Sequence, residues 1–284
     1  MNRIYQDQAA GLREEYLSSQ TKIITVVSGK GGVGKSVLSV NIAADLAAHG
    51  KRILLFDSDA GFANASILMG NTVKNTLSEY MRGNVTFNEC VQDTEYGVKI
   101  ISSGFDFTDW KVFQNNFNDS IMDEFLNLLK EVDFFIIDVG AGYSEKLNNF
   151  YLNSDTIFLI TVPEPTAVVN AYSLLKALSV LNVNGEIEII LNMIKNKNEI
   201  EMVKSVLSRT TKRFLNREIN NFHEISYDEN VHFSVRRQIP LISLKENSKF
   251  SKDIKKITSN ILNIKTSSHT NFTQRLKEIF GKDH

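Results

Sequence analysis

A glycine-rich segment with two lysines carries the clearest chemical signal in the sequence. Residues 29–36 match the phosphate-loop pattern G-x-x-x-x-G-K-[ST] in full. Glycines let the backbone curl so that successive N–H groups converge on phosphate oxygens, and the helix that follows adds its partial positive charge. Lys35 is expected to neutralise the β- and γ-phosphates, and Ser36 to ligate Mg²⁺. The expected nucleotide-binding residues of the loop are Gly29, Lys30, Gly31, Gly32, Val33, Gly34, Lys35 and Ser36.

Lys30 is a second lysine that this pattern does not require. One nucleotide has no evident need for two lysines from one loop. Lys30 could therefore reach the nucleotide of another subunit. Spacing alone fits a solvent-exposed lysine at least as well.

Three aspartates follow apolar, strand-like runs. Asp57 and Asp59 close the run that begins at Ile53, and Asp138 closes the run that begins at Phe134. An aspartate in this position of a phosphate-loop protein holds Mg²⁺, often through water, so Asp57 and Asp138 are the candidate metal ligands. Capping of a helix N-terminus is the alternative role. Asp59 lies beyond the strand, where it could orient an attacking water and give slow turnover.

A parallel sheet would bring the phosphate loop and the three aspartates together at one edge of the sheet. Strand-like runs alternate with amphipathic stretches from Lys22 to about Asn263, which predicts a doubly wound α/β fold with helices on both faces. Right-handed crossovers then place the strand C-termini, and a phosphate ligand, at one edge. The expected strands are 22–27, 52–56, 98–102, 133–137, 155–162 and 186–191, and the expected helices are 34–49, 120–131, 166–182, 200–215 and 248–262.

Composition excludes several classes of protein. The 284 residues carry a formal net charge of −1, so no overall positive field draws the chain to nucleic acid, although a local basic patch stays open. The single cysteine, Cys90, cannot form an internal disulfide or hold an iron–sulfur cluster. Neither a signal peptide nor a membrane-spanning run is found, and a cytoplasmic protein is expected.

Two further sets of residues are interpreted as structural. Helical spacing favours core packing for the aromatic run between Phe105 and Phe117 over a stacking platform. His223 and His232 have no metal-like spacing and no evident carboxylate partner, so they are expected to be ordinary histidines.

Together the motifs resemble the MinD/ParA family of deviant Walker A ATPases over about residues 22–262. The carrying segments are 30–36, 57–64, 138–142, 161–166 and 191–192. The resemblance implies ATP and Mg²⁺ as cofactors and a homodimer that sandwiches ATP. It makes Lys30 the residue that contacts the partner subunit's nucleotide, Asp59 the water-positioning aspartate and Asn192 an adenine ligand, with Lys30, Lys35 and Asp59 catalytic. The family often has a proline where this chain has Ile225-Ser-Tyr-Asp228, so the base pocket departs from its pattern.

The N-terminal arm, residues 1–20, indicates one branch of this family. Residues 7–13 read Asp-Gln-Ala-Ala-Gly-Leu-Arg and resemble the D-Q-A-x-x-L-R motif of the flagellar-number regulators (FlhG, also called YlxH or FleN). In that branch the arm stimulates FlhF, a GTPase related to those of the signal-recognition particle. By analogy Gln8 is the key side chain, and Asp7, Leu12 and Arg13 anchor the arm. A frayed polar terminus is the alternative.

The C-terminal segment, residues 264–284, is expected to be a linker followed by an amphipathic helix. Phe272, Leu276, Ile279 and Phe280 fall on one helical face, flanked by Arg275 and Lys277. This resembles a membrane-targeting helix, which would bind the anionic inner face of the cell membrane reversibly, and better in two copies. Alternatively the helix docks on its own domain, and both states can hold in turn.

The sequence thus predicts an N-terminal arm (1–20), an ATPase domain (21–263) and the tail. The expected function is an ATP-dependent, membrane-cycling dimeric switch that sets flagellar number and placement through FlhF. Flagellar switch-complex proteins are further partners on resemblance alone. A MinD-type division-site regulator is the alternative. A ParA-like DNA-partitioning protein fits less well, because near-neutral charge and the tail argue against DNA.

Overall fold

A computed structural model describes residues 21–58, 64–72, 75–104, 119–215, 218–219, 221–263, 275 and 278–279, with side chains described from 123 onward in the helix that begins at 119. Several predictions lie outside these residues. They concern the arm with Asp7, Gln8, Leu12 and Arg13, the aspartate at 59, the aromatic run, and three tail positions, Phe272, Leu276 and Phe280.

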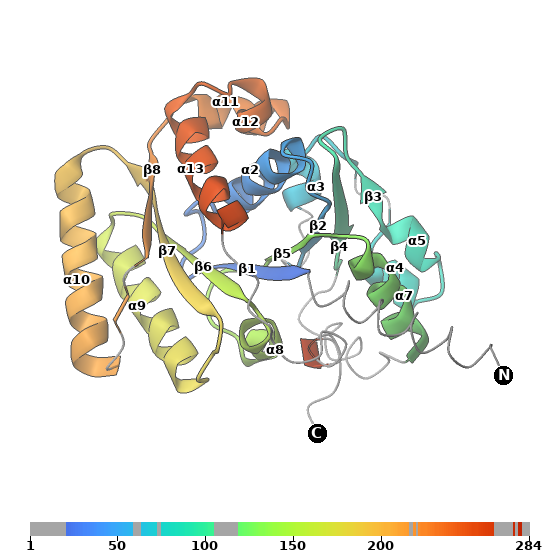
Figure 1. Cartoon of the computed structure of the whole chain (residues 1–284), viewed down its shortest axis with the longest axis horizontal. Helices are drawn as coiled ribbons and strands as arrows, with labels where there is room; N and C mark the ends of the chain where they lie inside the picture. Colours follow the sequence, from blue (N-terminus) through green and yellow to red (C-terminus); the bar gives the residue numbers. More distant parts are fainter. Residues whose placement is uncertain are drawn as a thin grey trace.

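The described residues form an eight-stranded sheet (Figure 1). The strands lie in the order β3-β4-β2-β5-β1-β6-β7-β8, and every neighbouring pair is parallel except β3–β4. Their bounds are β1 Lys22–Ser28, β2 Ile53–Asp57, β3 Gln92–Asp93, β4 Val98–Ser102, β5 Phe134–Asp138, β6 Thr156–Thr161, β7 Glu186–Ile194 and β8 Phe222–Ser226. All six predicted strands are confirmed, and β3 and β8 were not predicted.

Helices cover both faces of this sheet, which confirms the doubly wound fold (Figure 1). One face carries α2 (Lys35–Ala48), α3 (Asn64–Leu68), α12 (Leu241–Leu244) and α13 (Lys249–Asn263). The other carries α4 (Leu77–Met81), α5 (Phe87–Cys90), α7 (Asp119–Lys130), α8 (Asn148–Leu152), α9 (Pro165–Val180) and α10 (Lys197–Leu215). A 3-10 turn, η1 (Glu145–Leu147), precedes α8, and α11 (Asn230–Arg237) follows β8.

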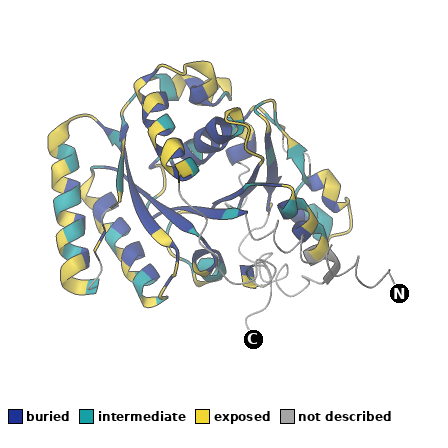
Figure 2. Cartoon of the chain, in the orientation of Figure 1, coloured by how far each residue is buried: buried dark blue, intermediate teal, exposed yellow. Residues whose placement is uncertain are grey.

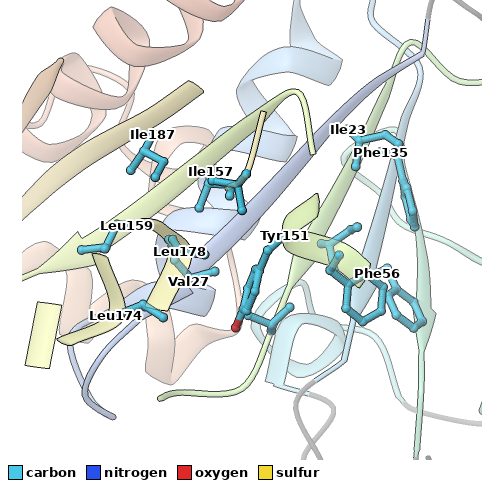
Figure 3. Packing of buried hydrophobic residues seen from close by; sticks show 14 of the residues in the cluster. Ile23, Val27, Phe56, Phe135, Tyr151, Ile157, Leu159, Leu174, Leu178 and Ile187 are labelled. Carbon is cyan, nitrogen blue, oxygen red and sulfur yellow. The ribbon is translucent and has the colours of Figure 1, made fainter. Parts of the chain in front are cut away.

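Alternation along the strands builds two hydrophobic cores. In β1, Ile23 and Val27 face the α9 side while Ile24 and Val26 face the α2 side, and all four are at most 2% exposed. Figure 3 shows the first of these cores, with Tyr151 of α8 among its members. Figure 2 shows the strands buried between exposed helix surfaces. Each fully buried large apolar side chain stabilises the fold by roughly 1.5–3 kcal/mol, so the sheet is a rigid support for the loops at its edges.

Two expectations about individual features can be tested here. Cys90 is fully buried, and burial raises the pKa of its thiol to about 12, so it is an inert core residue as predicted. Among the described helices, none has both the length and the apolar character that crossing a bilayer requires.

Candidate functional site

The phosphate loop has the strand–loop–helix context that the sequence predicts. It leaves β1 after Ser28, and α2 begins at Lys35 behind Gly34, which has a φ of 89°. A Cβ atom on Gly29 would lie 2.5 Å from the backbone of Asn170 in α9. Glycine is therefore required at 29 for close packing and at 34 for backbone conformation.

Lys35 and Asp138 form a buried ion pair at the end of this loop. The Lys35 Nζ lies 2.8 Å from Asp138 Oδ1, and the two side chains are 7% and 0% exposed. Ser39, one helical turn after Lys35, donates a hydrogen bond of 3.1 Å to the same oxygen. The other carboxylate oxygen, Asp138 Oδ2, is buried without a hydrogen-bond partner among the described residues. An ionised carboxylate in such a place needs a further cationic or hydrogen-bonding partner.

The unpartnered oxygen of Asp138 fits a site that binds magnesium and a nucleotide. A carboxylate oxygen is a preferred ligand of Mg²⁺ or of its bound water, and the phosphates that accompany the metal give Lys35 a second anionic partner. The residues present therefore fit ATP and Mg²⁺: Asp138 toward the metal, Lys35 and the loop amides toward the phosphates. Ser36 lies within this loop, and its part in metal binding stays a prediction.

Asp57 lies beside Asp138 at the same edge of the sheet. The two aspartates are register partners in the parallel pair β2–β5, as the edge argument anticipates. Asp57 Oδ2, however, accepts a 2.8 Å hydrogen bond from the Ala65 N–H at the start of α3. This is the capping role weighed as the alternative. Metal binding by Asp57 stays a prediction.

Lys30 lies in the phosphate loop and is partly exposed, with 39% of its side chain accessible. Its Nζ is 2.7 Å from the carboxylate of Glu164 and 3.4 Å from Thr166 Oγ1. Glu164 immediately precedes α9. In the single chain, therefore, the lysine predicted to act in another subunit is bound by a carboxylate of its own.

Asn192, predicted to contact adenine, supports the phosphate loop. Its Nδ2 donates a 2.8 Å hydrogen bond to the Val33 carbonyl, and its Oδ1 accepts one of 2.9 Å from the Met193 N–H. A bulge where β7 pairs with β8 places it there, and Met193 has a φ of 59°, unusual for a residue other than glycine. A role in base recognition stays a prediction.

The described part of the tail contacts the opposite edge of the sheet. Ile279 is fully buried within the hydrophobic core on the α9 side. Arg275 pairs with Asp155 at 3.1 Å and donates to the Asn153 carbonyl. Asp155 Oδ2 also accepts a 2.7 Å hydrogen bond from the Ile23 N–H, at the start of β1. Arg275, expected to face lipid head groups, is therefore bound to the domain here, and Ile279 matches the docked alternative.

One interpretation was wrong: His223 does have a carboxylate partner. Its Nε2 forms a hydrogen bond with the Glu188 carboxylate of the neighbouring strand, and both side chains are largely buried. The pair was missed because 35 residues separate its members. His232 is exposed. The described residues hold no cluster of three metal-ligating side chains.

Three residues that contact the predicted site residues were not predicted from the sequence. Ser39 could have been inferred, because position i+4 places it on the same helical face as Lys35. Glu164 stands in the segment 161–166 that carries the family resemblance, but no spacing indicates that it binds Lys30. Asp155 is simply a polar residue before a strand, and nothing in the sequence marks it as the partner of Arg275.

Comparison with known proteins agrees with this geometry. Residues 24–241 match a family model described as the CobQ/CobB/MinD/ParA nucleotide binding domain. The chain is 28% identical to the antiactivator FleN of Pseudomonas aeruginosa over 84% of this chain and 86% of that protein. It is 27% identical to the flagellum site-determining protein YlxH of Helicobacter pylori over 66% of this chain and 59% of that protein. The structure of the septum site-determining protein MinD from Pyrococcus horikoshii, complexed with Mg-ADP, aligns with a TM-score of 0.69 at 22% identity, over 86% of this chain and 96% of that one.

Proposed function

This chain belongs to the CobQ/CobB/MinD/ParA family of nucleotide-binding domains, and we propose that it is an ATP-dependent dimeric switch that cycles on and off the membrane and regulates flagellar number and placement. Its activity in that role is slow ATP hydrolysis that depends on dimerisation, and its macromolecular effector is an FlhF-type GTPase. Its place of action is the cytoplasmic face of the cell membrane.

The Lys35–Asp138 pair with its unpartnered oxygen carries the switch proposal. Both groups occupy a low-dielectric place where their interactions change strongly when a metal and phosphates arrive. The backbone after Asp138 responds directly, because the Gly142 N–H bonds the Ser28 carbonyl at the start of the phosphate loop. Nucleotide chemistry at the loop can therefore move the segment after β5.

Dimerisation would require Lys30 to exchange partners. Its ion pair with Glu164 is exposed on both sides, with side-chain accessibilities of 39% and 59%. Such a surface pair contributes little, about 0–1 kcal/mol. The triphosphate of a second subunit can therefore compete for Lys30 at small cost. This exchange and the family resemblance support the proposal of a homodimer formed with ATP.

The flagellar part of the proposal rests on similarity to FleN and YlxH, together with the arm motif at residues 7–13. The decisive experiment measures GTP turnover by the FlhF-type GTPase of the same organism. Full-length chain should stimulate turnover, whereas a chain without residues 1–20 and the Gln8→Ala variant should not. Gln6→Ala is the matched control, since it changes the same residue type outside the motif, and should stimulate normally.

A MinD-type division-site role is the second candidate, favoured by the structural similarity to MinD. The GTP turnover experiment separates the two. If the full chain leaves GTP turnover unchanged, the ATPase switch stands and the division role takes precedence. Equal stimulation by the full chain and by the Gln8→Ala variant would remove Gln8 from its role.

The tail is proposed to alternate between its docking site and the membrane. Docking buries Ile279 and satisfies Arg275. Release would free the apolar face for lipid, with two copies in a dimer binding much better than one. β1 offers a direct connection, because the amide of its second residue, Ile23, is bound by Asp155 and its other end leads into the phosphate loop.

Deleting residues 271–284 should abolish co-sedimentation of the ATP-loaded chain with anionic vesicles, because the apolar face of the tail is then absent. The control is Lys277→Ala, which removes one flanking charge and should weaken binding only by a few-fold. Unchanged vesicle binding after the deletion would contradict a membrane role for the tail. A urea titration of the deleted chain separates loss of membrane contact from a folding defect, because Ile279 is part of the hydrophobic core.

A further inference from the structure

Three consecutive helices, α11, α12 and α13, carry an excess of positive charge. Residues 227–263 contain seven Lys or Arg and four Asp or Glu, although the whole chain has a net charge of −1. Figure 1 shows these helices together at the top of the view, next to α2 and on the side of the sheet away from α9. We call their outward surface the basic face. Its charge is local and is not visible in the overall composition.

Cations on the basic face point to solvent. Arg236, Lys249 and Lys252 are exposed, and none makes an ion pair with a described residue. Lys256, which pairs with Asp253, keeps 75% of its side chain exposed. These charges are available to an external partner.

The carboxylates of the same segment are partly turned inward. Asp253 is 8% exposed and accepts hydrogen bonds from the backbone and side chain of Ser226. Asp228 accepts from the Asn230 and Phe250 N–H groups. Glu246 and Glu229 are exposed, and Glu246 pairs with Lys255. The potential outside the basic face is therefore more positive than the residue count alone implies.

Exposed apolar side chains accompany these cations. Of the twelve large apolar or aromatic side chains exposed among the described residues, four lie here: Tyr227, Phe233, Val235 and Leu244. Phe233 is 49% exposed, and the Arg237 guanidinium lies 4.9 Å from its ring centre. Figure 2 shows α11 as largely exposed surface. Exposed apolar and cationic side chains on the same group of helices match a bilayer interface, where the first enter the head-group region and the second meet anionic lipids.

We propose that the basic face is a second membrane contact, specific for anionic lipid, that acts together with the C-terminal tail. The inference rests on the membrane part of the proposed function. Four apolar side chains of one tail bind weakly, and stable but reversible anchoring typically combines such a segment with a basic patch. Each basic residue near an anionic surface strengthens binding roughly fivefold.

The tail can reach the same membrane plane. α13 ends at Asn263, and eleven residues separate it from Arg275. A chain of this length spans at most about 40 Å when extended. A tail released from its docking site can therefore insert beside α13 while the basic face rests on the lipid head groups. Nucleic acid, the other polyanion that fits a basic surface, would use the cations but gain little from exposed Phe233 and Leu244.

The test compares ATP-loaded full-length proteins in co-sedimentation with phosphatidylcholine vesicles with and without phosphatidylglycerol. The variant Arg236→Glu/Lys249→Glu/Lys252→Glu reverses three charges of the basic face. Its matched control, Lys176→Glu/Lys197→Glu/Arg209→Glu, makes the same charge change at exposed positions of α9 and α10. The first variant should lose at least roughly a hundredfold in affinity for the phosphatidylglycerol vesicles, with ATP turnover unchanged. The control should change affinity far less.

Three results would overturn the proposal. The basic-face variant could bind anionic vesicles as the unmodified chain does, or both variants could lose affinity equally, which would indicate only net charge. The basic-face variant could also lose binding to a DNA duplex while keeping vesicle binding, which would assign the face to nucleic acid. The tail is tested separately: if a chain lacking residues 271–284 binds anionic vesicles as tightly as the full chain and the basic-face substitutions abolish that binding, the tail hypothesis fails and the basic face remains a membrane contact. If the unmodified chain binds no anionic vesicle, both fail.

Discussion

Lys35→Ala is expected to abolish ATP-dependent dimerisation and to reduce ATP turnover at least 10²-fold. Lys35 is the cation that faces both Asp138 and the incoming phosphates, and preorganised charge stabilisation of this kind typically contributes about 10²–10³ in rate. Nucleotide-dependent dimer formation, followed by light scattering, and phosphate release are the measurements. A dimer that still forms with ATP would contradict the role assigned to Lys35.

The same substitution should also destabilise the nucleotide-free protein, and this effect must be separated from the first. Removing Lys35 leaves Asp138, which is 0% exposed, without its cation. Breaking one side of a buried pair typically costs about 3–5 kcal/mol. The double variant Lys35→Ala/Asp138→Asn removes the uncompensated charge. It should regain much of the lost stability in a urea titration and still fail to dimerise, so a rescue of dimerisation would show that the single variant had only been unfolded.

Asp59→Ala is expected to trap the ATP-bound dimer. If Asp59 positions the attacking water, its removal lowers hydrolysis by about 10²–10⁴ without weakening nucleotide binding. The dimer should then persist after mixing with ATP, whereas the unmodified chain returns to monomer as ATP is consumed. Scattering decay and phosphate release report the two quantities independently.

A remote carboxylate gives the control for Asp59. Asp93→Ala, on the edge strand β3, removes an aspartate whose side chain is 80% exposed and, among the described residues, is paired only with Lys99. It should leave turnover and dimer lifetime unchanged. Normal turnover in Asp59→Ala would remove that residue from catalysis, and loss of dimerisation in it would point to nucleotide binding instead.

Central strands were predictable because a strand buried on both faces consists of a continuous apolar run, such as Phe134–Ile137. β8 was missed for the converse reason. It is an edge strand of sequence Phe-His-Glu-Ile-Ser, in which only Ile225 is fully buried, so it carries neither a long apolar run nor a clear alternation. The short helices α4 and α5 were missed because four or five residues are too few for a 3.6-residue period to be recognised.

Site geometry was predictable where sheet topology dictates it. Asp57 and Asp138 end neighbouring parallel strands, so their adjacency follows from the order of the elements. Contacts made by long side chains across the fold were not predictable. The pairs Lys30–Glu164 and Arg275–Asp155 join residues separated by more than a hundred positions, and their formation depends on loop paths that no periodicity encodes.

When the tail is docked, lipid and the docking site on the same chain compete for it. Eleven residues separate Asn263 from Arg275, so in a single chain the tail cannot move more than about 40 Å from the end of α13. Confinement on this scale corresponds to an effective concentration in the millimolar range. Lipid therefore displaces an intramolecular ligand, and half-maximal recruitment should need a higher lipid density than binding of an isolated tail peptide needs. A longer tether would lower that effective concentration and thus the lipid density needed, without altering a residue that contacts nucleotide or lipid.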